Sequence, residues 1–120
     1  MHKKRILIVD DDETVVQLVK EILEVEGFET EIARDGIEGL EKIKKNQYDV
    51  IISNHQMPRM KGDRLYLEVR KLNPDLAKRM IFISGDINEF IISTGNGFLA
   101  KPFSHQQLME VVKDLIASDK

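Results

Sequence analysis

The chain has 120 residues, no cysteine and a net charge of −3 at pH 7. It is long enough to bury a core of its own, so we expect one domain, residues 1–120, without metal or disulfide cross-links. The composition excludes thiolate zinc sites, argues against a general nucleic-acid binder, and offers no apolar run beyond four residues for a membrane segment. The basic start, Met1 to Arg5, is too short for a signal peptide, so a cytoplasmic protein or domain is expected.

Short apolar runs alternate with helical patterns along the chain, which is typical of βαβ units. The first, third and fourth runs are continuously apolar, as strands buried on both faces are. The pattern therefore predicts an α/β fold with a parallel sheet, whose strands are expected at 5–9, 28–33, 49–53, 80–84 and 97–100.

Three helices are predicted from apolar residues at helical spacing. The first runs from Glu13 to Glu26 and stops at Gly27, with an inward face of Val15, Leu18, Val19, Ile22 and Leu23. The second runs from Gly36 to Asn46, with inward residues Ile37, Leu40 and Ile43. The third runs from Gly62 to Leu72 and ends before Pro74, with inward residues Leu65, Val69 and Leu72.

The fourth helix is expected to be short or irregular. Only 17 positions separate Ser84 from Lys101, and they must hold a connection, a helix and the start of a strand. The spacing of Ile87, Phe90 and Ile91 is helical, but the segment 93–97, Ser-Thr-Gly-Asn-Gly, interrupts it.

Capping residues mark the start of two helices. Asp12 is expected to cap the first helix. Ser104 and Gln107 form a capping-box pattern before the last helix. This last helix has the clearest pattern, with apolar residues at Leu108, Val111, Val112, Leu115 and Ile116.

Four of the predicted strands end in polar groups that could carry chemistry, namely Asp10 with Asp11, Asn54, Ser84 and Lys101. Ligands of a doubly wound sheet bind at the carboxyl ends of its strands, so these groups are expected to meet at one edge. Clustered carboxylates repel each other unless a cation lies between them. Magnesium, which takes oxygen ligands and shares sites with phosphate, is the natural cation.

These motifs resemble the response-regulator receiver domain, the CheY-like family, over nearly the whole chain. The resemblance implies a doubly wound, flavodoxin-like sheet of five parallel strands in the order 2-1-3-4-5, with helices on both faces. The Ser-Gly-Asp segment at 84–86, followed by Thr-Gly at 94–95 and Phe-Leu-Ala-Lys-Pro-Phe at 98–103, resembles receivers fused to hybrid histidine kinases. The resemblance rests on four segments: Ile6-Leu7-Ile8-Val9-Asp10-Asp11-Asp12, Val50-Ile51-Ile52-Ser53-Asn54-His55-Gln56-Met57-Pro58, Ile81-Phe82-Ile83-Ser84-Gly85 and Phe98-Leu99-Ala100-Lys101-Pro102-Phe103.

The resemblance places Asn54 where the family has its phosphorylated aspartate. It implies that Asp11 and residue 54 bind Mg²⁺ directly, and that Asp10 acts mainly through water. The backbone carbonyl of Gln56 would supply another oxygen ligand.

The remaining motif residues are implied to handle the phosphoryl group and the response to it. Ser84 would hydrogen-bond a phosphoryl oxygen, and Lys101 would pair with the phosphate as a point charge. Pro102 fits the family's cis peptide after the lysine. Phe98 stands at the position of the aromatic ring that follows the Ser84 hydroxyl inward on activation.

An amide at position 54 changes what the resemblance implies. A receiver accepts a phosphoryl group from a histidine kinase or a phosphotransfer domain onto a carboxylate. Asn54 has no anionic oxygen, so phosphotransfer is expected to be blocked, and the loss of one charge is expected to weaken Mg²⁺ binding. Either an engineered substitution or a natural one could have produced Asn54; the otherwise intact motifs, including Asp11 and Lys101, favour an engineered or recent change.

Two other functions stay open. The chain could be a pseudo-receiver that binds a protein partner without phosphorylation. It could also be a phosphatase, because Asp10, Asp12 and Thr14 satisfy the Asp-x-Asp-x-Thr pattern of haloacid dehalogenases, with Ser84 and Lys101 in that family's order. This last function ranks lowest, since no acidic residue follows a strand after Lys101.

Overall fold

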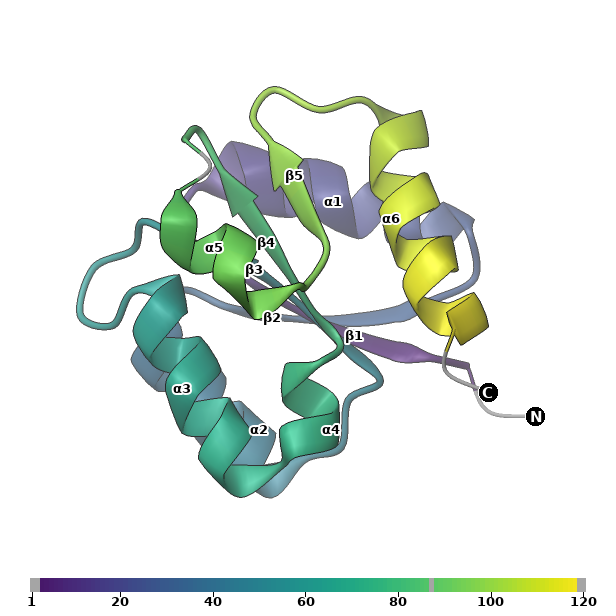
Figure 1. Cartoon of the computed structure of the whole chain (residues 1–120). Helices are drawn as coiled ribbons and strands as arrows, with labels where there is room; N and C mark the ends of the chain where they lie inside the picture. Colours follow the sequence, from purple (N-terminus) through teal and green to yellow (C-terminus); the bar gives the residue numbers. More distant parts are fainter. Residues whose placement is uncertain (1–2, 87, 119–120) are drawn as a thin grey trace.

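A single parallel sheet forms the middle layer of the computed structural model, which describes residues 3–86 and 88–118 (Figure 1). The strand order is β2-β1-β3-β4-β5. This confirms the predicted fold class and strand order. The strands span Arg5–Val9 (β1), Glu29–Ala33 (β2), Val50–Asn54 (β3), Met80–Ser84 (β4) and Phe98–Ala100 (β5).

Helices cover both faces of the sheet, as Figure 1 shows. One face carries α1 (Glu13–Val25) and α6 (His105–Ser118). The other face carries α2 (Gly36–Lys45), α3 (Gly62–Leu72), α4 (Pro74–Ala77) and α5 (Glu89–Thr94). In the described part of the chain, none of these helices is both long and apolar enough to cross a bilayer.

The three central strands are buried almost throughout, which explains their continuous apolar sequences. Successive side chains point to opposite faces of the sheet. Leu7, Ile51 and Phe82 therefore pack under α2, α3 and α5. Ile8 and Ile52 pack under α1 and α6 instead. These two cores pack against the two faces of the sheet below its carboxyl edge.

Two predicted inward positions are wrong. Leu18 of α1 is 46% exposed, whereas Val16, which was not predicted, is 1% exposed. The buried residues of α1 recur at a spacing of three to four from Val16, so Leu18 lies off that face. Leu72, the last residue of α3, is 52% exposed, and the core contacts pass to Leu76 and Ala77 of the next segment.

The chain between α3 and β4 contains a helix that the sequence did not predict. Asn73 ends α3 and at once caps α4, since its side chain accepts a hydrogen bond from the Leu76 N–H. Pro74 takes the first helical position, where its missing N–H costs nothing. The expected short helix before β5 is confirmed as α5, a helix of six residues. Ile87, assigned to its apolar face, lies outside the described residues.

Candidate functional site

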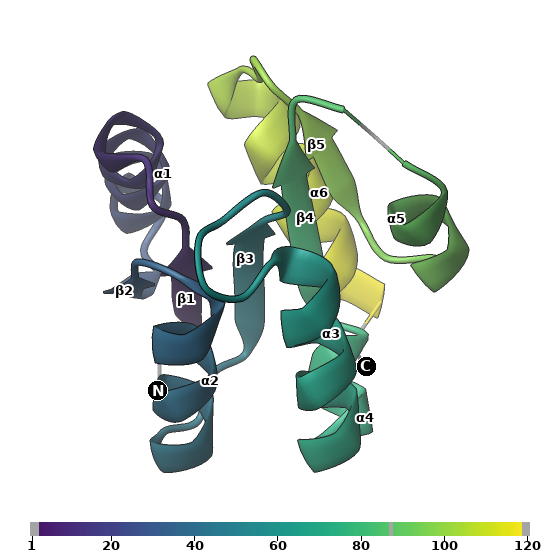
Figure 2. The same ribbon diagram turned by 90° about the vertical axis from the view of Figure 1, so that its left-hand side faces the viewer.

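The pairing of the strands brings the predicted polar groups to one edge of the sheet. Val9 pairs with Ser53, so Asp10 and Asn54 come next to each other at the ends of β1 and β3. Asn54 pairs with Ile83, and Ser84 pairs with Ala100, the residue before Lys101. This register brings the predicted residues to the carboxyl edge of the sheet. Figure 2 shows the carboxyl ends of β1, β3 and β4, drawn as arrowheads, pointing toward the same edge.

Asp10 is at the centre of this edge and is 1% exposed. Its Oδ1 accepts hydrogen bonds from the Asp12 N–H at 3.0 Å and from the Asn54 amide at 3.2 Å. Its Oδ2 is buried and has no hydrogen-bond partner among the described residues, with the Lys101 ammonium 3.7 Å away. Burial raises the pKa of the Asp10 carboxyl above its ordinary value. The Asp12 N–H and the Lys101 ammonium lower the pKa in part, whereas the charges of Asp11 and Asp12 raise it further.

Asn54 uses its amide nitrogen to join two oxygens of the site. Nδ2 donates to Asp10 Oδ1 at 3.2 Å and to the Gln56 carbonyl oxygen at 2.7 Å. These are two of the oxygens that the resemblance assigns to the magnesium site. The amide therefore stands between groups that a cation would otherwise hold together.

The donor set fits Mg²⁺ only in part. Asp10 offers a buried carboxylate oxygen that lacks a hydrogen bond, and Gln56 offers a carbonyl oxygen, both ligands that Mg²⁺ accepts. Asp11 adds a second carboxylate but is exposed to solvent. Within residues 3–86 and 88–118 no group of three or more acidic, His or Cys side chains could hold a metal ion. Asn54 presents N–H groups where a third carboxylate would complete the set.

Asp12 caps α1, as predicted. Its Oδ1 accepts hydrogen bonds from the N–H groups of Thr14 and Val15, at 2.9 and 3.4 Å. This cap turns the Asp12 side chain toward the helix, so Asp10 and Asp11 are the carboxylates left to face the edge of the sheet.

Ser84 is buried, and its hydroxyl contacts the following loop. It donates to the Asp86 carbonyl oxygen at 2.6 Å and accepts from the Asp86 N–H at 3.1 Å. A phosphoryl oxygen could take the hydroxyl proton only if the first of these bonds broke. The position of Ser84 therefore links the site to the loop that leads into α5.

The segment that follows β5 has the expected backbone. Lys101-Pro102 is a cis peptide. Lys101 points to Asp10, the buried acid, at 3.7 Å. Phe98 is 43% exposed, so its ring lies outward in this structure.

A contact that the sequence did not reveal fixes the loop after β3. Arg59 has a positive φ of 65° and forms two hydrogen bonds to the Asp35 carboxylate, at 2.7 and 3.1 Å. The Gly36 N–H donates to the Met60 carbonyl at 3.2 Å, and a Cβ on Gly36 would lie 2.5 Å from that oxygen. The start of α2 therefore anchors the loop that carries the Gln56 carbonyl.

Gly62 anchors the other end of the same loop. Its N–H donates to the His55 carbonyl at 2.9 Å. A Cβ at this position would lie 2.8 Å from the Asn54 carbonyl oxygen, so only glycine lets α3 begin so close to β3. The loop is thus tied down on both sides of Gln56.

A second unpredicted contact connects the site to α5. His55 is 5% exposed, and its Nε2 lies 3.0 Å from the Asn88 amide nitrogen. The same Asn88 side chain caps α5 by accepting from the Ile91 N–H at 2.9 Å. His55 and Asn88 are 33 positions apart, and no sequence pattern predicts their contact. Asparagine before a helix is a common capping pattern, so only the cap could have been predicted.

Comparisons with known proteins identify the family to which this arrangement is similar. A family model described as the response regulator receiver domain matches residues 6–113. The response regulator MprA of Mycobacterium sp. (strain KMS) is 30% identical over 115 residues, which cover 93% of this chain and 50% of MprA. The regulatory protein GlrR of Escherichia coli (strain K12) is 30% identical over 96% of this chain and 27% of GlrR. The chain thus spans half or less of the length of these relatives.

Solved structures agree in fold. A CheY-like receiver domain from Methanospirillum hungatei JF-1 has a TM-score of 0.90 and 33% identity, covering 98% of this chain and 96% of the other. Chemotaxis protein CheY4 of Vibrio cholerae has a TM-score of 0.87 and 29% identity, with coverage of 95% and 99%. The response regulator TrrA of Thermotoga maritima, solved with Mg²⁺-BeF, has a TM-score of 0.85 and 33% identity, with coverage of 93% and 98%.

Proposed function

This chain belongs to the response regulator receiver domain family, and we propose that Asn54 prevents it from accepting a phosphoryl group. The chain is a receiver domain of two-component signalling. Receivers of this family interact with histidine kinases or phosphotransfer domains, and such a protein is the proposed partner here. They are not enzymes in the usual sense.

The observation that carries the proposal is the pair of hydrogen bonds from the Asn54 amide to Asp10 and the Gln56 carbonyl. Phosphotransfer in the family forms a bond between a carboxylate oxygen and phosphorus while the bond from phosphorus to the kinase histidine nitrogen breaks. Asn54 offers a neutral carbonyl oxygen and a nitrogen whose lone pair is delocalised. Neither atom can replace the anionic nucleophile.

The other residues of the site keep parts of the family's machinery. Asp10, Asp11 and the Gln56 carbonyl would hold Mg²⁺, which supplies neutralising charge to phosphoryl oxygens when bound. The similarity to a receiver solved with Mg²⁺-BeF supports this placement of the ion. Lys101 would pair with the phosphoryl group, and the Ser84 hydroxyl would leave the Asp86 carbonyl to hydrogen-bond it.

A second candidate function is a pseudo-receiver that binds its partner without phosphorylation. The structure has one observation in its favour. With Asn54 present, both Asp10 Oδ1 and the Gln56 carbonyl have hydrogen-bond partners from within the chain, so these two oxygens need neither a phosphoryl group nor a cation as a partner. The phosphatase alternative loses support, because the receiver family model covers residues 6–113.

Acetyl phosphate with Mg²⁺ separates these functions. We expect no adduct on the chain with Asn54, and one base-labile phosphoryl adduct, seen by intact mass, on an Asn54→Asp variant. An adduct on the chain with Asn54 would overturn the proposal. No adduct on either protein would favour the pseudo-receiver.

A further inference from the structure

A pocket of about 920 Å³ opens at the end of the sheet opposite the candidate site. Its wall includes Arg5 and Glu29, the first residues of β1 and β2, together with Asp49 and Arg79, which precede β3 and β4. The last turn of α2 and the segment from Leu72 to Leu76 close its sides. In Figure 2 this end of the sheet lies away from the arrowheads. The pocket is therefore independent of Asn54 and of the proposed function.

The pocket is strongly cationic although the whole chain is not. Its lining contains five Lys or Arg residues and two acidic residues, an excess of three positive charges in a chain whose net charge is −3. The cations are Lys3, Arg5, Lys44, Lys45 and Arg79. Like charges gathered in one concave site raise the local concentration of anions.

Some of these cations already have partners within the chain, whereas others are exposed and can contact a ligand. Arg5 pairs with Glu31 and lies over the Tyr48 ring, and its backbone N–H donates to the Asp49 carboxylate at 2.8 Å. Lys44 and Lys45 are exposed at the end of α2, and within the described ranges neither forms an ion pair. Their ammonium groups can therefore meet a ligand without breaking an existing pair.

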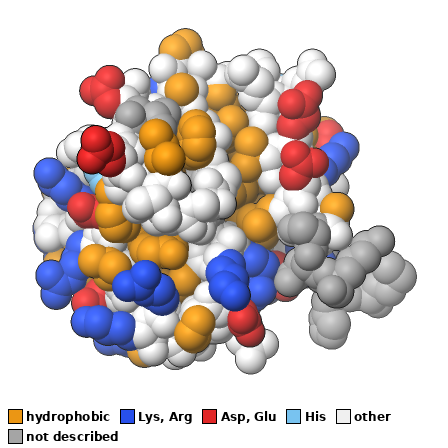
Figure 3. Space-filling model, viewed as in Figure 1, with side chains coloured by type: hydrophobic (Ala, Val, Ile, Leu, Met, Phe, Trp, Pro, Cys, Tyr) orange, Lys and Arg blue, Asp and Glu red, His pale blue; other side chains and the backbone are white. Residues whose placement is uncertain are grey.

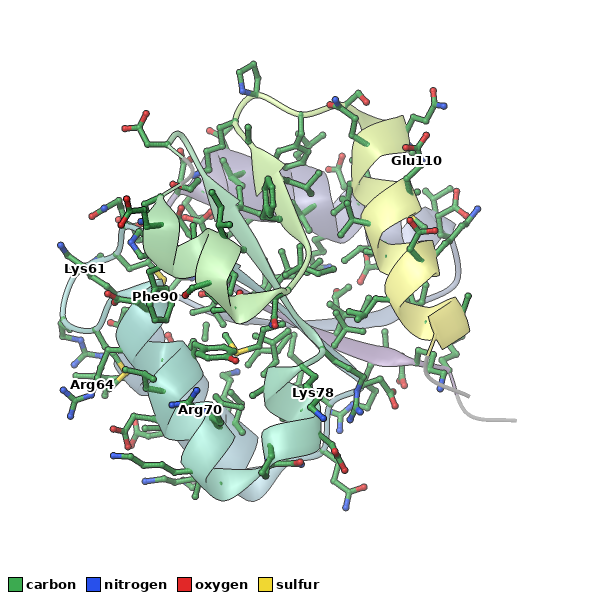
Figure 4. The ribbon with its side chains drawn as sticks, in the orientation of Figure 1. Lys61, Arg64, Arg70, Lys78, Phe90 and Glu110 are labelled. Atoms are coloured by element: carbon green, nitrogen blue, oxygen red, sulfur yellow. The ribbon has the colours of Figure 1, made fainter. Side chains whose placement is uncertain are left out.

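The surrounding surface adds to this field. Residues 70–78, which run from the end of α3 through α4, hold three further Lys or Arg residues and one acidic residue. Figure 3 shows Lys and Arg side chains over α3 and α4, and Figure 4 labels Arg70 and Lys78 among them. The opposite end of the sheet carries four consecutive acids, Asp10 to Glu13. Arg70, Lys71 and Lys78 thus add to the positive potential beside the pocket.

We propose that this pocket binds a small molecule that carries two or more phosphate groups. Lys44 and Lys45, which form no ion pair among the described residues, suit such a polyanion, because lysine ammonium groups bind phosphates as point charges. The buried side chains of Ile43 and Leu76 give the pocket an apolar floor for an organic part of the ligand. Its volume lies within the range of small-molecule sites, about 300–1,000 Å³.

The test uses inorganic pyrophosphate as the probe, in low salt and without divalent cations. Pyrophosphate is titrated into the ¹⁵N-labelled chain, and amide chemical shifts are followed. We expect saturable shifts centred on residues 44–49 and on the starts of β1 and β4. The double variant Lys44→Gln/Lys45→Gln is expected to raise the Kd about tenfold, which corresponds to about 1.4 kcal/mol.

The matched control is Lys61→Gln/Lys113→Gln, which removes the same charge from exposed lysines outside the pocket lining. Its Kd is expected to stay within about twofold of the original. Lys3 also lines the pocket and lies outside every helix and strand. The variant Lys3→Gln is therefore expected to weaken pyrophosphate binding as well. Equal weakening by the control, shifts centred on Lys101, or no saturation up to about 10 mM would each overturn the proposal.

Discussion

The amide nitrogen of Asn54 lies 3.2 Å from Oδ1 of Asp10 and donates a hydrogen bond to it. The same nitrogen donates to the Gln56 carbonyl at 2.7 Å. In a receiver with aspartate at this position, two carboxylates would face each other here and would need a cation between them. With asparagine, internal hydrogen bonds hold the same groups together.

An Asn54→Asp variant is therefore expected to be less stable without metal. It loses two hydrogen-bond donors and gains a charge beside buried Asp10, so its free energy of unfolding in EDTA is expected to fall by about 1–3 kcal/mol. Mg²⁺ is expected to restore much of this loss, since a ligand that binds only the folded state stabilises it. Urea unfolding with and without Mg²⁺ measures both effects. The explanation fails if the variant matches the original chain in EDTA.

Lys101→Met tests the partner of Asp10. The Lys101 ammonium is the cation 3.7 Å from the buried Asp10 Oδ2, and its removal leaves that charge without a countercharge. We expect a loss of about 1–2 kcal/mol, reduced from a fully buried pair because Lys101 is partly exposed.

The control for this variant is Lys113→Met, which removes a lysine 4.0 Å from Glu26 at the surface. Its cost is expected to stay below about 1 kcal/mol, as for other surface pairs. Equal losses for the two variants, measured by urea unfolding, would show that Lys101 has no special role.

The Asp35–Arg59 pair predicts a pH dependence. The Arg59 guanidinium, together with backbone N–H groups, holds the pKa of the Asp35 carboxyl below its ordinary value. A carboxyl group whose pKa is lower in the folded state than in the unfolded state stabilises the fold at every pH above its unfolded pKa, which is about 4. This stabilisation is lost as the pH falls through the pKa of the folded state. Asp35→Asn is therefore expected to cost stability at pH 7, with a difference from the original chain that shrinks toward about pH 2.

Unfolding of both proteins across this pH range measures the difference directly. Asp75→Asn, at an exposed position of α4, serves as the comparison and is expected to show only a small difference in stability. A constant difference for Asp35→Asn would mean that the pair does not govern this part of the pH profile.

Asn88→Ala tests the connection from His55 to α5. The variant removes both the contact to His55 and the cap on the Ile91 N–H, and loss of a cap costs about 1 kcal/mol. Amide hydrogen exchange is expected to speed up within 89–94 and to stay unchanged in β3. Asn73→Ala, which removes the cap of α4, should speed exchange near 74–77 instead. Unchanged exchange in α5 would rule out a role for Asn88 in holding it.

Apolar periodicity and capping are local signals, and they predicted the strands and most helix limits. The strand order came from the resemblance to receiver domains. α3 was predicted at its observed limits, Gly62–Leu72. The sequence did not predict α4, because Pro74 predicts the end of α3. Asn73-Pro74 also has the form of a helix cap followed by a first helical residue. The face of α1 was misplaced at Leu18, since a helix with several apolar sides does not fix its own rotation.

The contacts of the site could not be predicted in the same way. The sequence placed Asp10 and Asn54 at neighbouring strand ends, but only side-chain geometry shows that the amide nitrogen contacts both Asp10 and Gln56. The Arg59–Asp35 pair joins residues 24 apart through a backbone conformation that is uncommon for arginine. Such contacts depend on rotamers and loop paths, which leave no periodic signal.

We propose that residue 54 decides whether a cation or an amide holds this edge of the sheet together. Calorimetric titration of Mg²⁺ into the chain with Asn54 and into the Asn54→Asp variant tests it most directly. We expect the variant to bind Mg²⁺ at least about tenfold more tightly, because it restores one anionic oxygen ligand and removes the competing N–H groups. Equal affinities, or tighter binding by the chain with Asn54, would contradict the account.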